Sequence, residues 1–134
     1  MRRARQGKPL YRISNVVDAV NVVSLLTLLP IGLYDAAKVR PPITLRRAGE
    51  GEAYRGIGRD ELNLTGLPVL ADELGPFGSP TSDSERTKVT DDTREVLAVV
   101  FGVTVSEELE AGVEMLATLF REHAAADGVE IGYV

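Results

Sequence analysis

The chain of 134 residues contains no cysteine and only one histidine. Without cysteine it has no disulfide, no thiolate ligand for zinc and no thiol nucleophile, and a cytoplasmic protein is the simplest interpretation. The one imidazole, His123, lies near the C-terminal end of a predicted helix, where a surface side chain that favours the helix dipole is expected. The sequence therefore predicts no metal site, no cofactor and no catalytic triad built on histidine.

A long uninterrupted apolar segment is also missing. The most apolar stretch, residues 16–29, is shorter than a membrane span and is interrupted by Asp18, Asn21 and Ser24. The basic start MRRARQGK leads into PLYRIS and not into the apolar region of a signal peptide. We expect a core segment at residues 16–29, no membrane as a partner, and a single domain over residues 1–134, a length that buries roughly two-thirds of the unfolded surface.

Positive charge is concentrated in the first part of the chain. Residues 1–60 hold 11 Lys or Arg against 5 Asp or Glu, whereas residues 61–134 hold 4 against 15, so the two parts carry +6 and −11 of the net charge of −5. The acidic total argues against general coating of nucleic acid. A basic part still permits contact with a phosphate backbone on one face.

Asn15 is a suitable N-cap for a helix over residues 16–29, which Pro30 then ends. On such a helix Asp18, Asn21 and Ser24, spaced three apart, form one polar stripe along an apolar cylinder. Two interpretations of this stripe stay open. Its side chains either cap turns and satisfy neighbouring backbone, or they line a cleft.

Apolar runs of strand length, or short runs bounded by turns, predict four strands. The glycine-rich residues 56–66 are expected to form a loop, and they do not match a phosphate-binding pattern at a strand-to-helix junction. The last two strands are continuous apolar runs, which predicts central strands buried on both faces. The predicted strands are residues 43–48, 49–54 after a turn, 67–72 and 94–101.

The period of the apolar residues changes after residue 101. A capping-box pattern at Thr104 and Glu107 predicts the start of an amphipathic helix, and Gly128 predicts its end. The apolar positions that should face the sheet are Leu109, Val113, Leu116 and Phe120. The last residues, 129–134, are expected to form an edge strand.

The segment GPFGSPTSDSERT, residues 75–87, is long for a connection between two strands and has no apolar periodicity. Connections of this length in compact domains are usually functional or disordered. It is either a solvated hairpin loop or a functional loop that carries Asp83, Glu85 and Arg86.

Four short motifs occur together in one order. They are D-x-x-N at residues 18–21, P-x-x-x-[FY]-D at 30–35, [LV]-R-x-A-x-x-G-E at 45–52 and D-x-T-[RKQ]-x-V-L at 91–97. From about Gly7 to Phe101 the chain resembles the B3/B4 domain of the bacterial phenylalanyl-tRNA synthetase β subunit, and most of all the free-standing B3/B4 proteins. The resemblance implies an α+β fold with a layered, β-sandwich-like sheet and packed helices. It also implies more sequence on the N-terminal side than this chain carries.

In the synthetase this module hydrolyses tRNA charged with the wrong amino acid, so the resemblance implies tRNA or aminoacyl-tRNA as the partner. It places the amino-acid pocket between the D-x-x-N segment and the glycine-rich loop. The implied substrate-binding residues are Asp18, Asn21, Gly78, Ser79, Ser84 and Arg86. The chain departs from the motif with Gly32 in place of a histidine and Val20 in place of a threonine, so the synthetase's own amino-acid specificity is not carried over.

An aminoacyl ester is already activated, and its hydrolysis needs a positioned water and donors for the developing oxyanion. Asp83, with Ser82 beside it, is the predicted catalytic group that orients the water. Backbone N–H groups of residues 75–84 are the predicted oxyanion nest, and Arg86 is the predicted anchor for a phosphate or carboxylate. The structural alternative is that Asp83 and Ser84 form turns while Arg86 pairs with Glu85 or Asp91.

Two other functions stay open. The first is a non-catalytic RNA-binding or protein-binding module that uses the basic surface around Arg40, with Arg46, Arg47 and Arg55 as predicted phosphate contacts. The second is a hydrolase of a small amide or ester. Association into a homo-oligomer through an exposed sheet edge beside residues 43–48 also stays open.

Overall fold

The computed structural model describes residues 13–102, 104–123 and 128–133. The chain divides into two units. One unit combines Met1–Leu29 with Gly102–Gly132, and the other combines Pro30–Phe101 with Tyr133–Val134. Within the described residues the first unit holds two α-helices and the second holds seven strands, all paired antiparallel.

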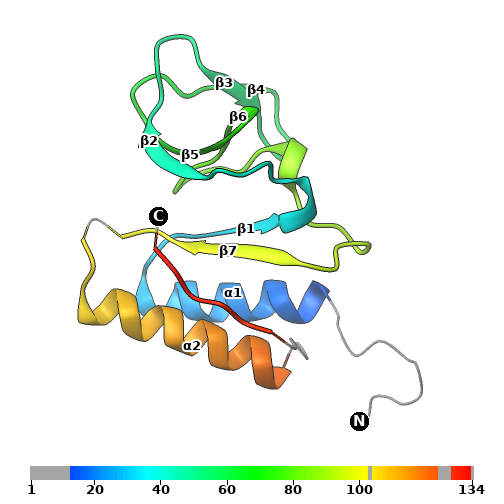
Figure 1. Cartoon of the computed structure of the whole chain (residues 1–134), viewed down its shortest axis with the longest axis vertical. Helices are drawn as coiled ribbons and strands as arrows, with labels where there is room; N and C mark the ends of the chain where they lie inside the picture. Colours follow the sequence, from blue (N-terminus) through cyan, green and yellow to red (C-terminus); the bar gives the residue numbers. More distant parts are fainter. Residues whose placement is uncertain (1–12, 103, 124–127, 134) are drawn as a thin grey trace. The chain divides into compact units, whose positions relative to one another are not determined.

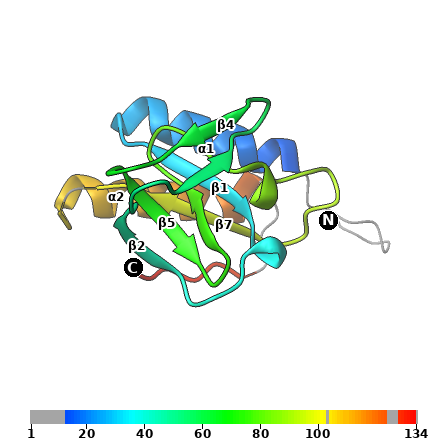
Figure 2. The same cartoon turned by 90° about the horizontal axis from the view of Figure 1, so that it is seen from above.

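The helical unit consists of α1 (Ile13–Thr27) and α2 (Glu107–His123), which lie side by side in Figures 1 and 2. Each helix buries one apolar face, because apolar residues recur every three or four positions. Gly112 of α2 lies close to Thr27 at the end of α1, since a Cβ built on it would be in van der Waals contact with a Thr27 side-chain carbon at 3.4 Å. The buried residues are Val16, Ala19, Val20 and Val23 on α1, and Leu109, Leu116, Ala117 and Phe120 on α2.

The ends of the helices differ from the predicted ones. Helix α1 begins at Ile13, so Asn15 lies inside it and is not the N-cap. Helix α2 begins at Glu107, and the side chain of Ser106, not Thr104, accepts a hydrogen bond from the N–H of Leu109 (3.1 Å). The predicted stop at Gly128 follows residues 124–127, which lie outside the described part. Residues 128–133 are not a strand, so the predicted edge strand is wrong there.

The β unit contains three small sheets (Figure 1). Strand β1 (Ile31–Asp35) pairs with β7 (Val96–Val100), and β3 (Ala53–Arg55) pairs with β4 (Glu61–Asn63). In the third sheet β5 (Pro68–Asp72) lies between β2 (Thr44–Arg47) and β6 (Gly75–Gly78). Two short 3₁₀ helices, η1 (Ala36–Lys38) and η2 (Glu85–Thr87), complete the unit.

Two clusters of buried side chains form the core of the β unit. The first contains Tyr34, Val39, Leu70, Phe77 and Phe101, and the second contains Ala48, Tyr54, Leu64 and Val69. Strand β5 contributes Val69 to one cluster and Leu70 to the other, because successive side chains of a strand point to opposite faces. This explains why a continuous apolar run forms the central strand of its sheet.

The four strands predicted from apolar runs are confirmed as β2, β3, β5 and β7. Strand β7 is not central, since it pairs with β1 alone among the described strands and all five of its residues are only partly buried. Three strands occur where none is predicted, namely β1, β4 and β6. Residues 75–87 are not one loop, because they begin with β6 and end with η2.

Candidate functional site

Asp83, the predicted catalytic residue, is half-buried and accepts a hydrogen bond from the hydroxyl of Tyr34, with 2.7 Å between the phenol oxygen and Oδ1. Tyr34 lies on β1 and is 0% exposed. Backbone contacts fix Asp83 from two further sides, because it bridges to Gly78 and its carbonyl accepts from the N–H of Ile57 (3.1 Å). The structure therefore joins Asp83 to a buried tyrosine 49 residues away in the sequence.

Two glycines make room for the Tyr34 phenol. A Cβ built on Gly32 would lie 2.2 Å from the Tyr34 hydroxyl oxygen, and one on Gly78 would lie 2.1 Å from it. No side chain fits at such distances, so the hydroxyl occupies a slot between β1 and β6 that exists because both positions are glycine. Gly78, a predicted substrate-binding residue, serves here as the wall of that slot.

The pKa of Asp83 is raised from its ordinary value. Burial of the carboxylate is the larger cause, and the hydrogen bond from Tyr34 acts in the opposite direction. The pKa of Tyr34 is raised as well, by its burial first and then by the charge and hydrogen bond of Asp83. Tyr34 therefore stays a protonated donor, while Asp83 is a carboxylate of increased basicity.

Ser79 and Ser82 form a tight turn next to Asp83. The Ser79 hydroxyl is buried and lies 3.0 Å from the Ser82 hydroxyl, and the Tyr54 hydroxyl lies 2.8 Å from the same Ser82 oxygen. The N–H groups of Ser79 and Ser84 donate to the carbonyls of Ser82 and Phe77 (2.8 and 3.0 Å). Those of Thr81 and Ser82 donate to the Ser79 hydroxyl (3.3 and 3.0 Å).

Because these four N–H groups are used inside the loop, they are not available to an oxyanion in this conformation. The predicted nest is therefore wrong at residues 79, 81, 82 and 84. The Ser84 hydroxyl accepts from the N–H of Arg86 (3.0 Å) and caps η2, as the structural alternative for Ser84 predicts.

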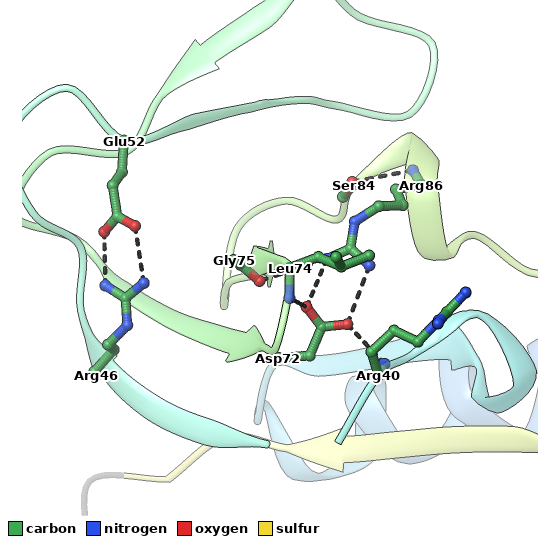
Figure 3. A network of polar contacts seen from close by, with 8 residues as sticks. All are labelled: Arg40, Arg46, Glu52, Asp72, Leu74, Gly75, Ser84 and Arg86. Carbon is green, nitrogen blue, oxygen red and sulfur yellow. Dashed lines mark hydrogen bonds and ion pairs between the residues drawn. The ribbon is translucent and has the colours of Figure 1, made fainter. Parts of the chain in front are cut away.

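Arg86 donates to Asp72 through its two terminal guanidinium nitrogens, Nη1 and Nη2, at 3.0 and 2.9 Å (Figure 3). Asp72 also accepts from the backbone N–H groups of Arg40 and Leu74 (2.8 and 2.9 Å). Burial alone would raise the pKa of Asp72, but these hydrogen bonds and the charge of Arg86 outweigh it, and the pKa is lowered. The internal partner of Arg86 is thus Asp72 and not Glu85 or Asp91. This pairing occupies the two guanidinium nitrogens of Arg86 that were predicted to bind a phosphate or carboxylate of the ligand.

The three predicted phosphate-binding arginines are exposed, but they are not equivalent. Arg46 makes a two-fold contact with Glu52 at 2.6 and 2.8 Å (Figure 3). The hydrogen bonds from Arg46 and from the N–H of Gly49 lower the pKa of Glu52 to about 2. No ion pair involves Arg47 or Arg55 in the part of the chain that the structure describes. These two side chains are the better candidates for contact with an anionic partner.

Asn21 and Asp18 both lie exposed on α1. Asn21 borders a surface hollow of about 440 Å³ with Ser24, Leu25, Leu28 and Leu29. The hydroxyl of Ser24 donates to the carbonyl of Leu29 (2.8 Å), so this member of the polar stripe satisfies backbone. Asn21 and Asp83 belong to different units, and their predicted convergence on one cleft stays a prediction.

Several motif residues serve the architecture of the β unit. In the motif at residues 30–35 the buried Asp35 accepts a hydrogen bond from Thr93 of the last motif, with 2.8 Å between the side-chain oxygens. Asp35 also caps η1 through the N–H of Ala37 (3.0 Å). The motif at residues 45–52 contains both partners of the Arg46–Glu52 pair. At these positions the motif residues therefore contribute to the folding of the β unit.

Sequence reasoning assigns no role to Tyr34, Tyr54 or Asp72, although Tyr34 is the aromatic position of the motif at residues 30–35 and all three residues contact the loop. Their partners are 49, 28 and 14 residues away, and no local pattern encodes such contacts. One usable signal is Gly32 two residues before Tyr34, since positions two apart share a face of a strand.

Among residues 13–102, 104–123 and 128–133 there is no group of three or more His, Cys, Asp or Glu side chains that could hold a metal ion. No helix in the same described residues is long and apolar enough to cross a membrane.

Comparison with known proteins gives consistent relatives. Residues 1–124 match the family model of the B3/4 domain. The phenylalanine–tRNA ligase beta subunit of Methanopyrus kandleri is 35% identical over 95 residues, which cover 70% of this chain and 15% of that protein. The corresponding subunit of Brucella abortus is 38% identical over 65 residues, or 48% of this chain and 8% of that protein. The chain therefore spans only a small part of these relatives.

A solved structure shares the fold. An N-terminal fragment of the phenylalanyl-tRNA synthetase beta subunit from Pyrococcus horikoshii superimposes with a TM-score of 0.72 over 83% of this chain and 40% of that one, at 23% sequence identity. This match confirms the predicted α+β fold, which has two helices and antiparallel sheets in the described residues. The family match covers most of the chain, and the chain belongs to the B3/4 domain family.

Proposed function

We propose that this B3/4 domain binds aminoacyl-tRNA and hydrolyses the ester of mischarged species, with Asp83 orienting the attacking water. The observation that carries the proposal is the Asp83 carboxylate, which is half-buried, has a raised pKa and is held by a buried donor. Among the described residues no ion pair neutralises it. A carboxylate placed in this way at an energetic cost is a candidate for general-base chemistry.

The proposed reaction needs little from the protein. Asp83 accepts a proton from water as the water oxygen attacks the ester carbonyl carbon. The tetrahedral intermediate then collapses, which releases the free amino acid and returns a proton to the ribose oxygen of the tRNA. Since four loop N–H groups are engaged, the neighbouring hydroxyl of the terminal ribose is the proposed donor to the oxyanion.

The test is release of labelled amino acid from a panel of mischarged tRNAs by the purified chain. Asp83→Asn should reduce the rate by a factor on the order of 10²–10⁴ if Asp83 activates the water. Asn keeps an oxygen that can accept from Tyr34, so the variant is expected to fold. Ser82→Ala serves as the control and should reduce the rate less. Unchanged turnover in Asp83→Asn would remove Asp83 from the chemistry.

A second function is favoured by the exposed arginines. If no aminoacyl-tRNA is hydrolysed but tRNA binds, the domain is a non-catalytic RNA-docking module that uses Arg47 and Arg55. Hydrolysis of small esters without any tRNA affinity would instead favour a small-molecule hydrolase. Three measurements, namely amino-acid release, tRNA affinity and hydrolysis of small esters, therefore separate all three functions.

A further inference from the structure

We infer that the Tyr34 hydroxyl is the positioning group of the site, which orients the Asp83 carboxylate and sets its basicity. This inference rests on the proposed function of Asp83 for its catalytic meaning. The contact itself lies wholly within the β unit and does not depend on any substrate. Tyr34 acts through Asp83 and is not proposed to touch the ester.

The Tyr34 ring is fixed in place. Its centroid lies 4.9 Å from that of Phe77 at an interplanar angle of 84°, an edge-to-face contact. Gly32 and Gly78 close on its hydroxyl end from two strands. A phenol that is fully buried, packed against Phe77 and enclosed at its hydroxyl end has little freedom to follow a moving partner. It therefore imposes its own geometry on Asp83.

Tyr34 is the donor recorded for Asp83 within the described residues. The nearest charged neighbours in the sequence are used elsewhere, because Glu85 pairs with Lys88 (2.9 Å) and Arg86 with Asp72 (2.9 Å). The other titratable group on this side is Tyr54 of β3, whose hydroxyl binds the adjacent Ser82. One neutral donor thus orients the carboxylate, and no ion pair within the described residues competes with a water for it.

The direction of the electrostatic effect follows from these contacts. Burial raises the pKa of Asp83, and the Tyr34 hydrogen bond opposes that rise. Without the hydroxyl the burial remains and the opposing bond is lost. The carboxylate would then be protonated over a wider range of pH, and its orientation would no longer be fixed.

The test is Tyr34→Phe, which removes one oxygen and keeps the ring. The pKa of Asp83 is measured by carbon NMR of its side-chain carboxyl across a pH titration, in the wild type and the variant, with no tRNA present. We expect the pKa of Asp83 to rise in Tyr34→Phe. Tyr54→Phe is the matched control, because it removes a buried hydroxyl that binds Ser82 and should leave the Asp83 titration unchanged.

The second arm measures deacylation against pH. In Tyr34→Phe the acidic limb of the rate profile should move to higher pH, and kcat should fall about 10- to 100-fold through lost orientation, with KM unchanged. The amide spectrum of each variant confirms that it is folded.

The possible outcomes are distinct. If Asp83 titrates identically in the wild type and Tyr34→Phe, the inference is overturned, whatever the activity. If Asp83 is essential for deacylation but the rate profile does not move, the inference is overturned and the proposed function stands. If the pKa rises in Tyr34→Phe but no tRNA is deacylated by the wild type, the donor role stands and the proposed function fails.

Discussion

Arg86 and Arg46 each bind a carboxylate through two guanidinium nitrogens, but the two pairs differ in their access to water (Figure 3). The side chain of Asp72 is 0% exposed, and Arg86 is its neutralising partner. The side chains of Arg46 and Glu52 are 39% and 29% exposed. Because exposed pairs gain little over hydration, only the Asp72–Arg86 pair should matter for folding.

We predict that Arg86→Ala lowers the free energy of unfolding by about 3 kcal/mol, since it leaves a buried carboxylate unpaired. Arg46→Ala is the matched control and should change it far less. Urea unfolding at neutral pH measures both. Equal effects of the two substitutions would show that burial does not separate these pairs.

The same contact sets a pH dependence. The pKa of Asp72 is lower in the folded protein than its ordinary value, so its stabilisation is present above that value and is lost as the pH falls through the folded pKa. Wild-type stability should therefore decline below about pH 4. In Arg86→Ala this part of the decline should be smaller, because the favourable partner of the charged form is gone.

At the scale of helices and strands, the sequence predicts those elements whose residues form a recognisable local pattern. The apolar run at residues 67–72 identifies β5 because that strand places side chains in both core clusters. Strand β4 contains only Leu62 between Glu61 and Asn63, too little alternation to be recognised. In β1 the glycine that weakens the strand pattern makes room for Tyr34. The reason for this glycine is the position of the Tyr34 hydroxyl, which local composition does not show.

The close approach of Gly78 to the Tyr34 ring predicts that Gly78→Ala destabilises the protein. The backbone of Gly78 is not in the left-handed region, so alanine is disfavoured only by its collision with the Tyr34 ring. Overpacking of this kind should lower the free energy of unfolding by about 1–3 kcal/mol. Gly49→Ala is the control, since the nearest atom to its Cβ is a Glu52 oxygen at 3.6 Å. In a Tyr34→Leu background, the effect of Gly78→Ala should shrink, which denaturant unfolding of the wild type, the two single variants and the double variant would measure.

At the scale of the whole molecule, parts of the candidate site cannot be predicted from the sequence, because they depend on contacts between distant segments. Ser82 and Asp83, the predicted catalytic residues, are neighbours in the sequence, yet their contacts with Tyr54 and Tyr34 come from distant strands. Asn21 belongs to the helical unit, whereas Asp83 belongs to the β unit. Whether they share a cleft depends on how the units meet, a property that no local motif encodes.

Charge is also a property of the whole chain. Of the +6 carried by residues 1–60, residues 1–12 supply five basic and no acidic side chains, whereas residues 13–60 hold six basic against five acidic ones. In the described part of this region Arg46 is already paired with Glu52. If RNA is bound through phosphate contacts, we therefore expect the N-terminal residues to supply most of the salt dependence.

We predict that tRNA affinity falls steeply with salt and that glutamine at the five N-terminal basic positions lowers the log–log slope by up to about 4, whereas Arg47→Ala with Arg55→Ala lowers it by up to about 2. The control replaces Arg46 by Ala and Glu52 by Gln together, which removes one positive and one negative charge and should leave the slope nearly unchanged. Filter binding over a range of salt concentrations gives each slope. A slope that depends on Arg47 and Arg55 alone would place the interface on the β unit, and affinity independent of salt would contradict phosphate contacts altogether. The five positions are Arg2, Arg3, Arg5, Lys8 and Arg12.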